Sequence, residues 1–339
     1  MVELRTLAVS TAVNEDLDFL ANELCQEHLT YGDMFVGHPK TMVDVLCDAR
    51  LTLVAVGASS VFQCVNLIRV LLIIFPLINK KINLLITSPS PINIFLIPFF
   101  AIYVRGGVTV AVHDVSPHYG GLKGWLYKLQ NNVIFKYSSK IILYSNYSAG
   151  EAARLYPNAP ADLVVKILRT PAEIVCYECD IPRRDEREFD FVWWGRAEDY
   201  KGVMDLPVIA MKYAEHNKNF LVISDLAKYP NIRARLDMLD NVKLISGRLP
   251  LVDLMRNLLT AKVNICPYVS ATQSGVIPFC AALGLPSLVY DVGALREQVA
   301  SLQCGEMVSD VSGANAFEFL ASVNDSSFAE IKRNYFLDC

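Results

Sequence analysis

Acidic residues are missing from a long stretch of this sequence. No Asp or Glu occurs between Asp48 and Asp114, although Arg and Lys do, among many Leu, Ile and Phe residues. The 339-residue chain as a whole carries a net charge of −4, so this stretch differs in sign from the rest. A basic and apolar surface of this kind is typical of contact with anionic lipid headgroups.

An uninterrupted apolar segment that could span a membrane is also lacking. The hydrophobic share of 53% is high for a soluble protein, but a spanning helix needs about 20 consecutive apolar residues. The run from Cys64 to Ile78 is broken by Arg69 and Pro76, and the run 84–104 contains three prolines. We expect buried helices and strands here, because the strands of a covered parallel sheet are apolar on both faces.

Neither a secretory leader nor a metal-binding cysteine pattern is indicated. Glu3 and Arg5 stand near the start and no long apolar segment follows them, so we expect a cytoplasmic protein. The nine cysteines are mostly scattered within apolar runs, which is typical of reduced, buried thiols. Cys176 and Cys179 have no second pair and no nearby His, so zinc is not expected. No other metal and no cofactor is expected either.

The chain is long enough for two domains of ordinary size, and strand-like and helix-like runs alternate in both halves. Strands are expected at 51–57, 82–87, 108–113, 140–144, 189–195, 220–225, 242–246, 263–267 and 287–291. The alternation predicts an α/β protein with two Rossmann-like, doubly wound parallel-sheet domains that face a cleft. The expected limits are 1–170 for the first domain, 171–188 for a linker, 189–325 for the second domain, and 326–339 for a C-terminal helix that could return to the first domain.

Two segments of the second half join a strand-like run to a helix-like run through small, hydroxyl or basic residues. They are FVWWGRAEDYKG at 191–202 and NICPYVSATQSGV at 264–276. A helix start carries unpaired N–H groups and about half a positive charge, so Gln273, Ser274 and Gly275 would form an anion pocket. Arg196 and Lys201 supply cations. The pattern predicts a phosphorylated ligand at the edge of a parallel sheet.

The order and spacing of these motifs are more specific than the motifs themselves. The series consists of Gly195-Arg196, Lys201-Gly202, Pro267-Tyr268, Gln273-Ser274-Gly275-Val276, Ala282-x-Gly284-x-Pro286, and Asp291-Val292-Gly293 through Glu297. Between Phe189 and Val299 it resembles the C-terminal half of the GT-B glycosyltransferases of family 4. A weaker similarity lies at HDVSPH, residues 113–118, in the first half.

The resemblance implies a role for each matched residue. Arg196 and Lys201 would bind the diphosphate of a nucleotide sugar and stabilise it as the leaving group. His113 would lie close to the reacting sugar, with Asp114 and His118 beside the acceptor or behind His113. The remaining donor contacts would come from Gly195, Thr272, Gln273, Ser274, Gly275, Val276 and Glu297.

The sequence departs from the family pattern at two positions. The family usually places two glutamates eight residues apart around the helix that follows the phosphate turn, and the aligned positions here are Ala271 and Phe279. The resemblance implies that Thr272, Gln273 and Ser274 take over polar contacts. The glycine-rich loop that commonly opens the N-terminal domain is missing as well.

The resemblance implies a metal-independent hexosyltransferase. It would move a hexose from a UDP- or GDP-linked sugar to a saccharide or lipid-linked saccharide, with retention of the anomeric configuration. The expected location is the cytoplasm, as a peripheral protein at the inner membrane face, with no nucleic acid as partner.

Two alternatives to this function stay open. A sugar-nucleotide epimerase of the same fold would need acidic or histidine side chains as general bases in the second half, where His216 is the sole histidine. A non-catalytic nucleotide-sugar-binding partner is favoured by the loss of both glutamates.

Overall fold

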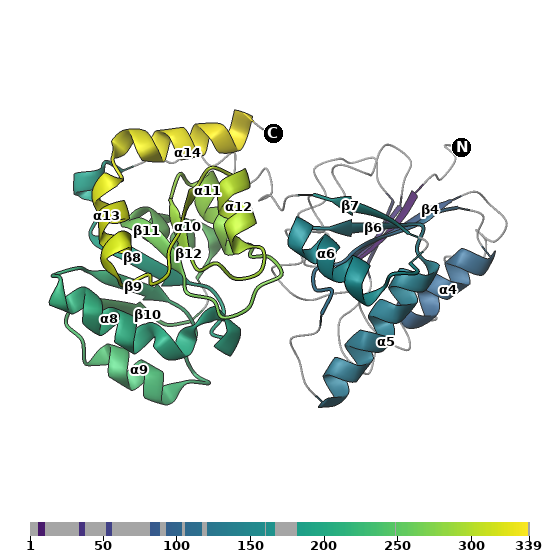
Figure 1. Ribbon diagram of the computed structural model, residues 1–339, viewed down its shortest axis with the longest axis horizontal. Helices are drawn as coiled ribbons and strands as arrows, with labels where there is room; N and C mark the ends of the chain where they lie inside the picture. Colours follow the sequence, from purple (N-terminus) through teal and green to yellow (C-terminus); the bar gives the residue numbers. More distant parts are fainter. Residues whose placement is uncertain are drawn as a thin grey trace. The chain divides into compact units, whose positions relative to one another are not determined.

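The chain forms two compact units, Met1–Pro171 and Ala172–Cys339 (Figure 1). The computed structural model describes residues 6–10, 34–37, 52–55, 82–88, 93–103, 106–116, 121–159, 161–166, 182–247 and 249–337. Each unit has its own parallel sheet and its own hydrophobic core. The domain limits expected from the sequence stay predictions. The helices expected at 11–29 and 61–74, His118, Cys176 and Cys179 lie outside the described residues.

A seven-stranded parallel sheet forms the first unit, in the order β3-β2-β1-β4-β5-β6-β7. The strands are β1 (Thr6–Ser10), β2 (Met34–Gly37), β3 (Thr52–Ala55), β4 (Asn83–Ser88), β5 (Val108–Ala111), β6 (Lys140–Leu143) and β7 (Asp162–Val165). The strand order proceeds outward in both directions from the β1–β4 pair, which is the doubly wound arrangement.

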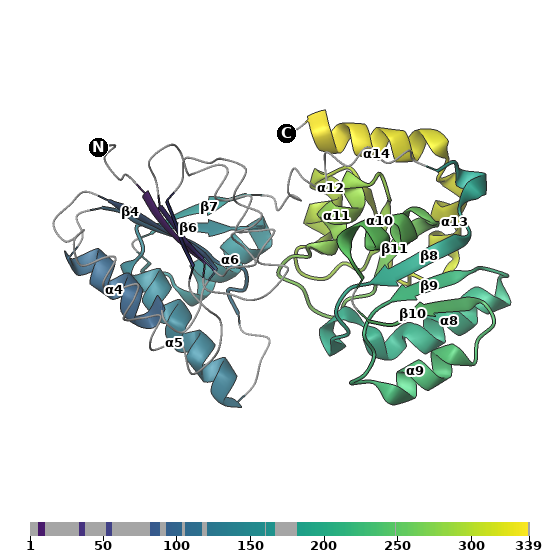
Figure 2. The ribbon, with the colours of Figure 1, turned by 180° about the vertical axis from the view of Figure 1, so that it is seen from behind.

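Helices α4 (Asn93–Tyr103), α5 (Gly121–Tyr137) and α6 (Asn146–Leu155) connect the later strands of this sheet. The steps from β4 to β5 and from β5 to β6 move in the same direction, so right-handed crossovers place α4 and α5 on the same face. Both views show these two helices side by side (Figures 1 and 2). Buried Leu96 and Phe100 of α4 and Ile134 of α5 pack onto the strands in the first core.

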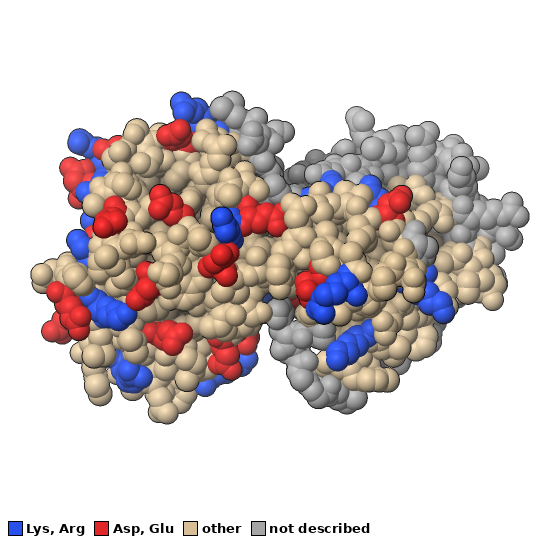
Figure 3. Space-filling model, viewed as in Figure 1, with Lys and Arg blue, Asp and Glu red and all other residues tan. Residues whose placement is uncertain are grey.

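A six-stranded parallel sheet forms the second unit, in the order β10-β9-β8-β11-β12-β13. The strands are β8 (Phe189–Trp194), β9 (Phe220–Ile223), β10 (Val242–Ile245), β11 (Ala261–Cys266), β12 (Ser287–Val289) and β13 (Gly305–Met307). In the core, the Phe191 ring stacks on Tyr213 at a centroid distance of 4.2 Å. On the face that Figure 3 shows, acidic and basic side chains are interspersed over this unit.

The helices of the second unit cover both faces of its sheet. They are α8 (Leu206–Glu215), α9 (Pro230–Asp237), α10 (Leu251–Leu259), α11 (Val276–Ala282), α12 (Leu295–Ser301), α13 (Ala314–Ser322) and α14 (Asp325–Leu337). The C-terminal helix α14 packs against α11, with Phe328 and Tyr335 buried. In the described ranges we find no helix with the length and apolar character that a membrane crossing requires.

Candidate functional site

Two loops meet at the edge of the second sheet where the carboxyl ends of its strands lie. Strands β8 and β11 are hydrogen-bonded neighbours and run parallel, so the segments that follow them emerge together. The first segment is 195–202 and the second is 267–275. The backbone N–H of Val269 donates to the carbonyl oxygen of Tyr200 at 2.8 Å. This hydrogen bond ties the two loops to each other.

The side chain of Lys201 lies inside this pair of loops. Lys201 ends the 3₁₀ helix Asp199–Lys201, and only 8% of its surface is exposed. Its Nζ lies 5.6 Å from the centroid of the Tyr268 ring, and a Cβ built on Gly195 would lie 3.4 Å from the same Nζ. The ammonium group is therefore held between the end of β8 and the loop after β11.

Two glycines allow the loop after β8 to take this course. The backbone φ is +115° at Gly195 and +76° at Gly202, in the left-handed region that other residues rarely adopt. A Cβ on Gly202 would collide with the carbonyl oxygen of Pro267. Gly202 thus permits the close approach of the two loops, while the Ser224 hydroxyl donates to the carbonyl oxygen of Gly195 at 2.7 Å.

The turn before α11 is fixed by a side chain from α12. Gln298 is 1% exposed. Its carboxamide accepts from the Ser274 N–H at 2.8 Å and donates to the Ser274 carbonyl oxygen at 3.1 Å. The Val276 N–H donates to the Ser274 Oγ at 3.3 Å. The Ser274 amide, which the sequence assigns to the anion pocket, and the Val276 amide therefore make hydrogen bonds within the protein.

Gly275, in the same turn, has free space beside its Cα. A Cβ built on Gly275 would meet nothing within 4 Å, so its backbone has space beside it. Thr272, Gln273 and Ser274 before it are buried. The Ser274 hydroxyl donates to the Tyr268 Oη at 3.4 Å. One tyrosine ring thus contacts the turn at its hydroxyl and the Lys201 ammonium at its face.

Arg196 and Glu297 flank this arrangement. Arg196 follows Gly195 directly and its side chain is exposed. Glu297 lies in the first turn of α12 and is half-buried. Its neighbour Gln298 makes the contact with Ser274, although the sequence analysis did not single it out. The only signal for Gln298 was its place beside Glu297 after a glycine turn.

Buried apolar side chains occupy the two positions where the resembling family has glutamates. Ala271 is 4% exposed and Phe279 is 3% exposed. The Phe279 ring packs against Trp194 with the centroids 4.9 Å apart. The Ala271 carbonyl oxygen accepts from the Ala294 N–H at 3.2 Å. A Cβ at position 293 would collide with the same oxygen, and the backbone φ there is +56°, so this position needs the glycine that it has. Neither position brings a carboxylate to the loops.

Cys266 ends β11 close to Lys201. Burial raises the pKa of the Cys266 thiol to about 11, and the Lys201 ammonium acts in the opposite direction. Because the reactive form of cysteine is the thiolate, this thiol is not a nucleophile at neutral pH. Cys266, Cys280 and Cys304 are free and buried, as expected from the sequence.

His113 and Asp114 follow β5 in the first unit. The His113 Nδ1 lies 3.5 Å from the Asp114 Oδ1, and the side chains are 29% and 24% exposed. The Asn131 carboxamide on α5 donates to the backbone carbonyl oxygens of Asp114 at 3.1 Å and Val115 at 2.9 Å. Helix α5 thus fixes the backbone that carries the His–Asp pair.

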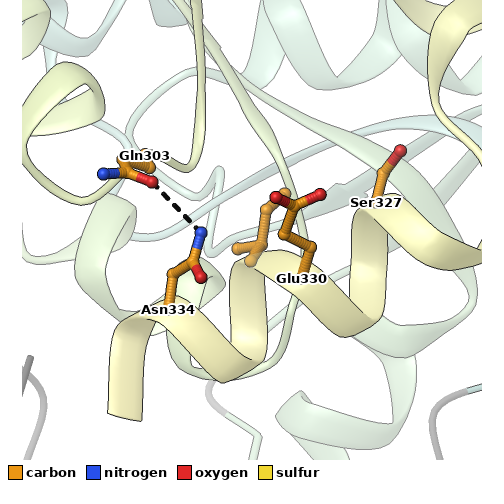
Figure 4. A pocket seen from close by; sticks show the side chains of 5 residues that line it. Gln303, Ser327, Glu330 and Asn334 are labelled. Carbon is orange, nitrogen blue, oxygen red and sulfur yellow. Dashed lines mark hydrogen bonds between the residues drawn. The ribbon is translucent and has the colours of Figure 1, made fainter. Parts of the chain in front are cut away.

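A pocket lies elsewhere on the second unit, between the end of α12 and helix α14 (Figure 4). Gln303, Ser327, Glu330, Ile331 and Asn334 line it, and the Asn334 Nδ2 donates to the Gln303 Oε1 at 3.1 Å. None of the site residues expected from the sequence lines this pocket. Within the part of the chain that is described, no group of three or more His, Cys, Asp or Glu side chains is arranged to hold a metal ion.

No family model matches the chain, and no curated protein matches it either. Solved structures do. A glycosyltransferase from Rickettsia africae is 13% identical, with a TM-score of 0.67 over 99% of this chain and 94% of that one. HepE of Anabaena, in complex with UDP, is 13% identical, with a TM-score of 0.66 over 98% and 93%. Sucrose-phosphate synthase of Thermosynechococcus elongatus is 12% identical, with a TM-score of 0.68 over 98% and 93%.

The chain has the GT-B fold. The similarity extends over both Rossmann-like units, as the alternation of strands and helices and the resemblance predicted. Because identities of 13% or less establish a fold and not an activity, the function has to be argued from the site.

Proposed function

We propose that this protein is a glycosyltransferase that uses a nucleotide sugar as donor. The observation that carries the proposal is the position of Lys201. The residue is buried, and its ammonium shares the Tyr268 ring with the Ser274–Gly275 turn at the carboxyl edge of a parallel sheet. Ligands of open α/β sheets bind at this edge. The similar structure of HepE contains UDP, which supports a nucleoside diphosphate as the ligand here.

The reaction moves a hexose from a UDP- or GDP-linked sugar to a saccharide or lipid-linked saccharide. The bond between the anomeric carbon and a phosphate oxygen breaks, and a bond to the acceptor oxygen forms. Negative charge grows on the departing diphosphate, where Lys201 and Arg196 stabilise it. The leaving phosphate takes the proton of the acceptor hydroxyl. Transfer with retention then needs neither a protein nucleophile nor a metal, in keeping with apolar Ala271 and Phe279.

The other expected residues complete the proposal. Gly195 and Gly275 let the backbone approach the diphosphate, and Glu297 contacts the sugar or the ribose. The polar residues Thr272, Gln273 and Ser274 and the backbone of Val276 form the donor side. In the first unit, His113 acts on the sugar, with Asp114 orienting it and His118 on the acceptor side. We place the reaction in the cytoplasm, at the inner face of a membrane.

A panel of UDP-, GDP- and ADP-sugars tests this proposal. A donor at 100 times its Kd should raise the free energy of unfolding by about 2.7 kcal/mol, visible as a higher Tm, and slow hydrolysis or transfer should release the nucleoside diphosphate. The absence of a Tm shift with every nucleotide and nucleotide sugar would refute the proposal.

A second candidate function is a non-catalytic partner that binds a nucleotide sugar. The buried, apolar Ala271 and Phe279 favour it, and stabilisation by a nucleotide sugar without turnover would identify it. The epimerase finds no comparable support. The only histidine of the second half, His216, follows the C-terminal end of α8, whereas the loops of the candidate site adjoin the N-terminal end of that helix. The His216 ring packs on Phe317 at a centroid distance of 4.3 Å.

Replacement of Arg196 by Ala should weaken donor binding about tenfold. Hydrogen bonds to charged groups contribute about 1.5–3 kcal/mol, and the lower value suits an exposed side chain such as Arg196. Isothermal titration with UDP or GDP measures the loss. Arg233→Ala is the matched control, because Arg233 on α9 is half exposed and pairs with Asp237 within its own helix. If the Arg196→Ala and Arg233→Ala variants bound the nucleotide with equal affinity, Arg196 would not be part of the donor site.

A further inference from the structure

Helix α4 exposes large apolar side chains on the face that points away from the first sheet. Phe95 is 66% exposed, Ile102 is 63% exposed and Tyr103 is 54% exposed. The opposite face, with Leu96, Ile97 and Phe100, is buried in the core, so core packing does not account for the outer apolar residues. The sequence of α4, NIFLIPFFAIY, contains no charged residue. A surface helix of a soluble protein ordinarily carries polar residues on its outer face.

Helix α5 extends the same surface with one aromatic ring and basic groups. Trp125 is 58% exposed, and Lys128 and Lys136 are exposed on the same stripe of the helix. No acidic residue occurs in α5 either. Because α4 and α5 pack side by side, these residues form one surface. We define the α4–α5 face as Phe95, Ile102, Tyr103, Trp125, Lys128 and Lys136.

Nearly all charged residues in the surrounding sequence are basic. Between residues 49 and 150 the only acidic residue is Asp114, while the basic residues are Arg50, Arg69, Lys80, Lys81, Arg105, Lys123, Lys128, Lys136 and Lys140. In the space-filling view, basic side chains lie over the described part of α5, with no acidic ones among them (Figure 3). A positive and apolar surface is complementary to an anionic and apolar partner.

We propose that the α4–α5 face docks on a membrane leaflet that contains anionic lipid. Exposed Trp and Tyr side chains suit the lipid headgroup region, because their rings are apolar and also carry a group that hydrogen-bonds to water. Phe95 and Ile102 enter the acyl boundary, and Lys128 and Lys136 pair with lipid phosphates. This mode of attachment needs no spanning helix. It is independent of the donor site, which belongs to the second unit.

Co-sedimentation of the full chain with vesicles tests the proposal. We expect binding to vesicles of phosphatidylcholine with phosphatidylglycerol, weaker binding to pure phosphatidylcholine, and loss of the difference at high salt, because salt screens the lipid charge. Phe95→Ser with Ile102→Ser should reduce binding at least tenfold. Lys128→Gln with Lys136→Gln should also reduce it about tenfold, but only for the anionic vesicles.

Matched variants on the second unit serve as controls. Met238→Ser removes an apolar side chain that is 80% exposed, and Lys243→Gln removes an exposed lysine; neither should change vesicle binding. Unchanged Tm and UDP affinity would show that the α4 and α5 variants are folded. Equal binding to neutral and anionic vesicles, or full binding by the Phe95/Ile102 variant, would overturn the proposal. So would a dimer in sedimentation velocity that dissociates when Phe95 and Ile102 are replaced, because a second copy would then cover the face.

Discussion

Lys201→Met should weaken binding of the nucleoside diphosphate about 100-fold. Lys201 is buried, and a charged hydrogen bond in such a place contributes at the upper end of about 1.5–3 kcal/mol. Methionine is one atom shorter than lysine, but its unbranched, uncharged side chain can still pack on the Tyr268 ring. We therefore expect a folded protein with a Tm close to that of the wild type, no detectable heat of UDP or GDP binding at moderate concentration, and greatly reduced turnover.

Two further lysine variants separate charge from geometry. Lys243→Met removes an exposed lysine of the same unit, 3.9 Å from Glu188, and should leave binding unchanged. Lys201→Arg keeps the charge, but the planar guanidinium is larger than the ammonium that lies between Gly195 and Tyr268. It should therefore also lose affinity. Wild-type affinity of Lys201→Met would show that the diphosphate binds elsewhere.

The central strands of the second sheet were predictable from sequence because both of their faces are covered. Strand β9, with the sequence FLVI, is buried at every residue, so it reads as a continuous apolar run. The edge strands β3 and β10 were predicted, but the other two edge strands were missed. Strand β13, GEM, and strand β7, DLVV, end their sheets and are largely exposed, so charged residues interrupt the apolar pattern. Strands β1 and β2 were also missed: TLAVS begins and ends with a hydroxyl residue and MFVG ends with a glycine, so neither forms a continuous apolar run.

The cations of the candidate site were predictable because they belong to local motifs. Lys201 stands between two glycines whose spacing reflects the turn after β8, and Ser274 and Gly275 precede a helix. The role of Gln298 was not predictable, because its hydrogen bonds join residues 24 positions apart. A sequence shows a turn or a helix start directly, whereas a side chain that supports a turn from another helix becomes visible only in three dimensions. The assignment of these residues to donor binding stays a prediction.

Gln298→Ala should destabilise the second unit and the turn at Ser274 together. The substitution leaves the buried N–H and carbonyl oxygen of Ser274 without their partner. Each buried group that loses its hydrogen bond costs about 1–3 kcal/mol, so the free energy of unfolding should fall by several kcal/mol. Denaturant unfolding measures this loss. Arg296→Ala is the control, because Arg296 lies on the same helix with a side chain that is 65% exposed.

Gln298→Glu tests whether the N–H group of the carboxamide, which donates a hydrogen bond to Ser274, is needed as well as the oxygen that accepts one. The introduced carboxyl can still accept from the Ser274 N–H, but when ionised it places an oxygen against the Ser274 carbonyl oxygen. Protonation restores the donor, and burial disfavours the charge, so the pKa of this carboxyl should be raised in the folded state. The variant should then match the wild type only at acidic pH and lose stability as the pH rises through that raised pKa.

The effect of Gln298 on donor binding separates a positioning role from a purely structural one. If Gln298 holds the turn in the shape that receives a diphosphate, Gln298→Glu should recover its UDP or GDP affinity and its stability in the same acidic range. A variant that regains stability at acidic pH and still fails to bind would show that the carboxamide contributes more than the shape of the turn. A variant that binds normally at neutral pH while remaining less stable would show that Ser274 and its amide stay outside the donor contacts.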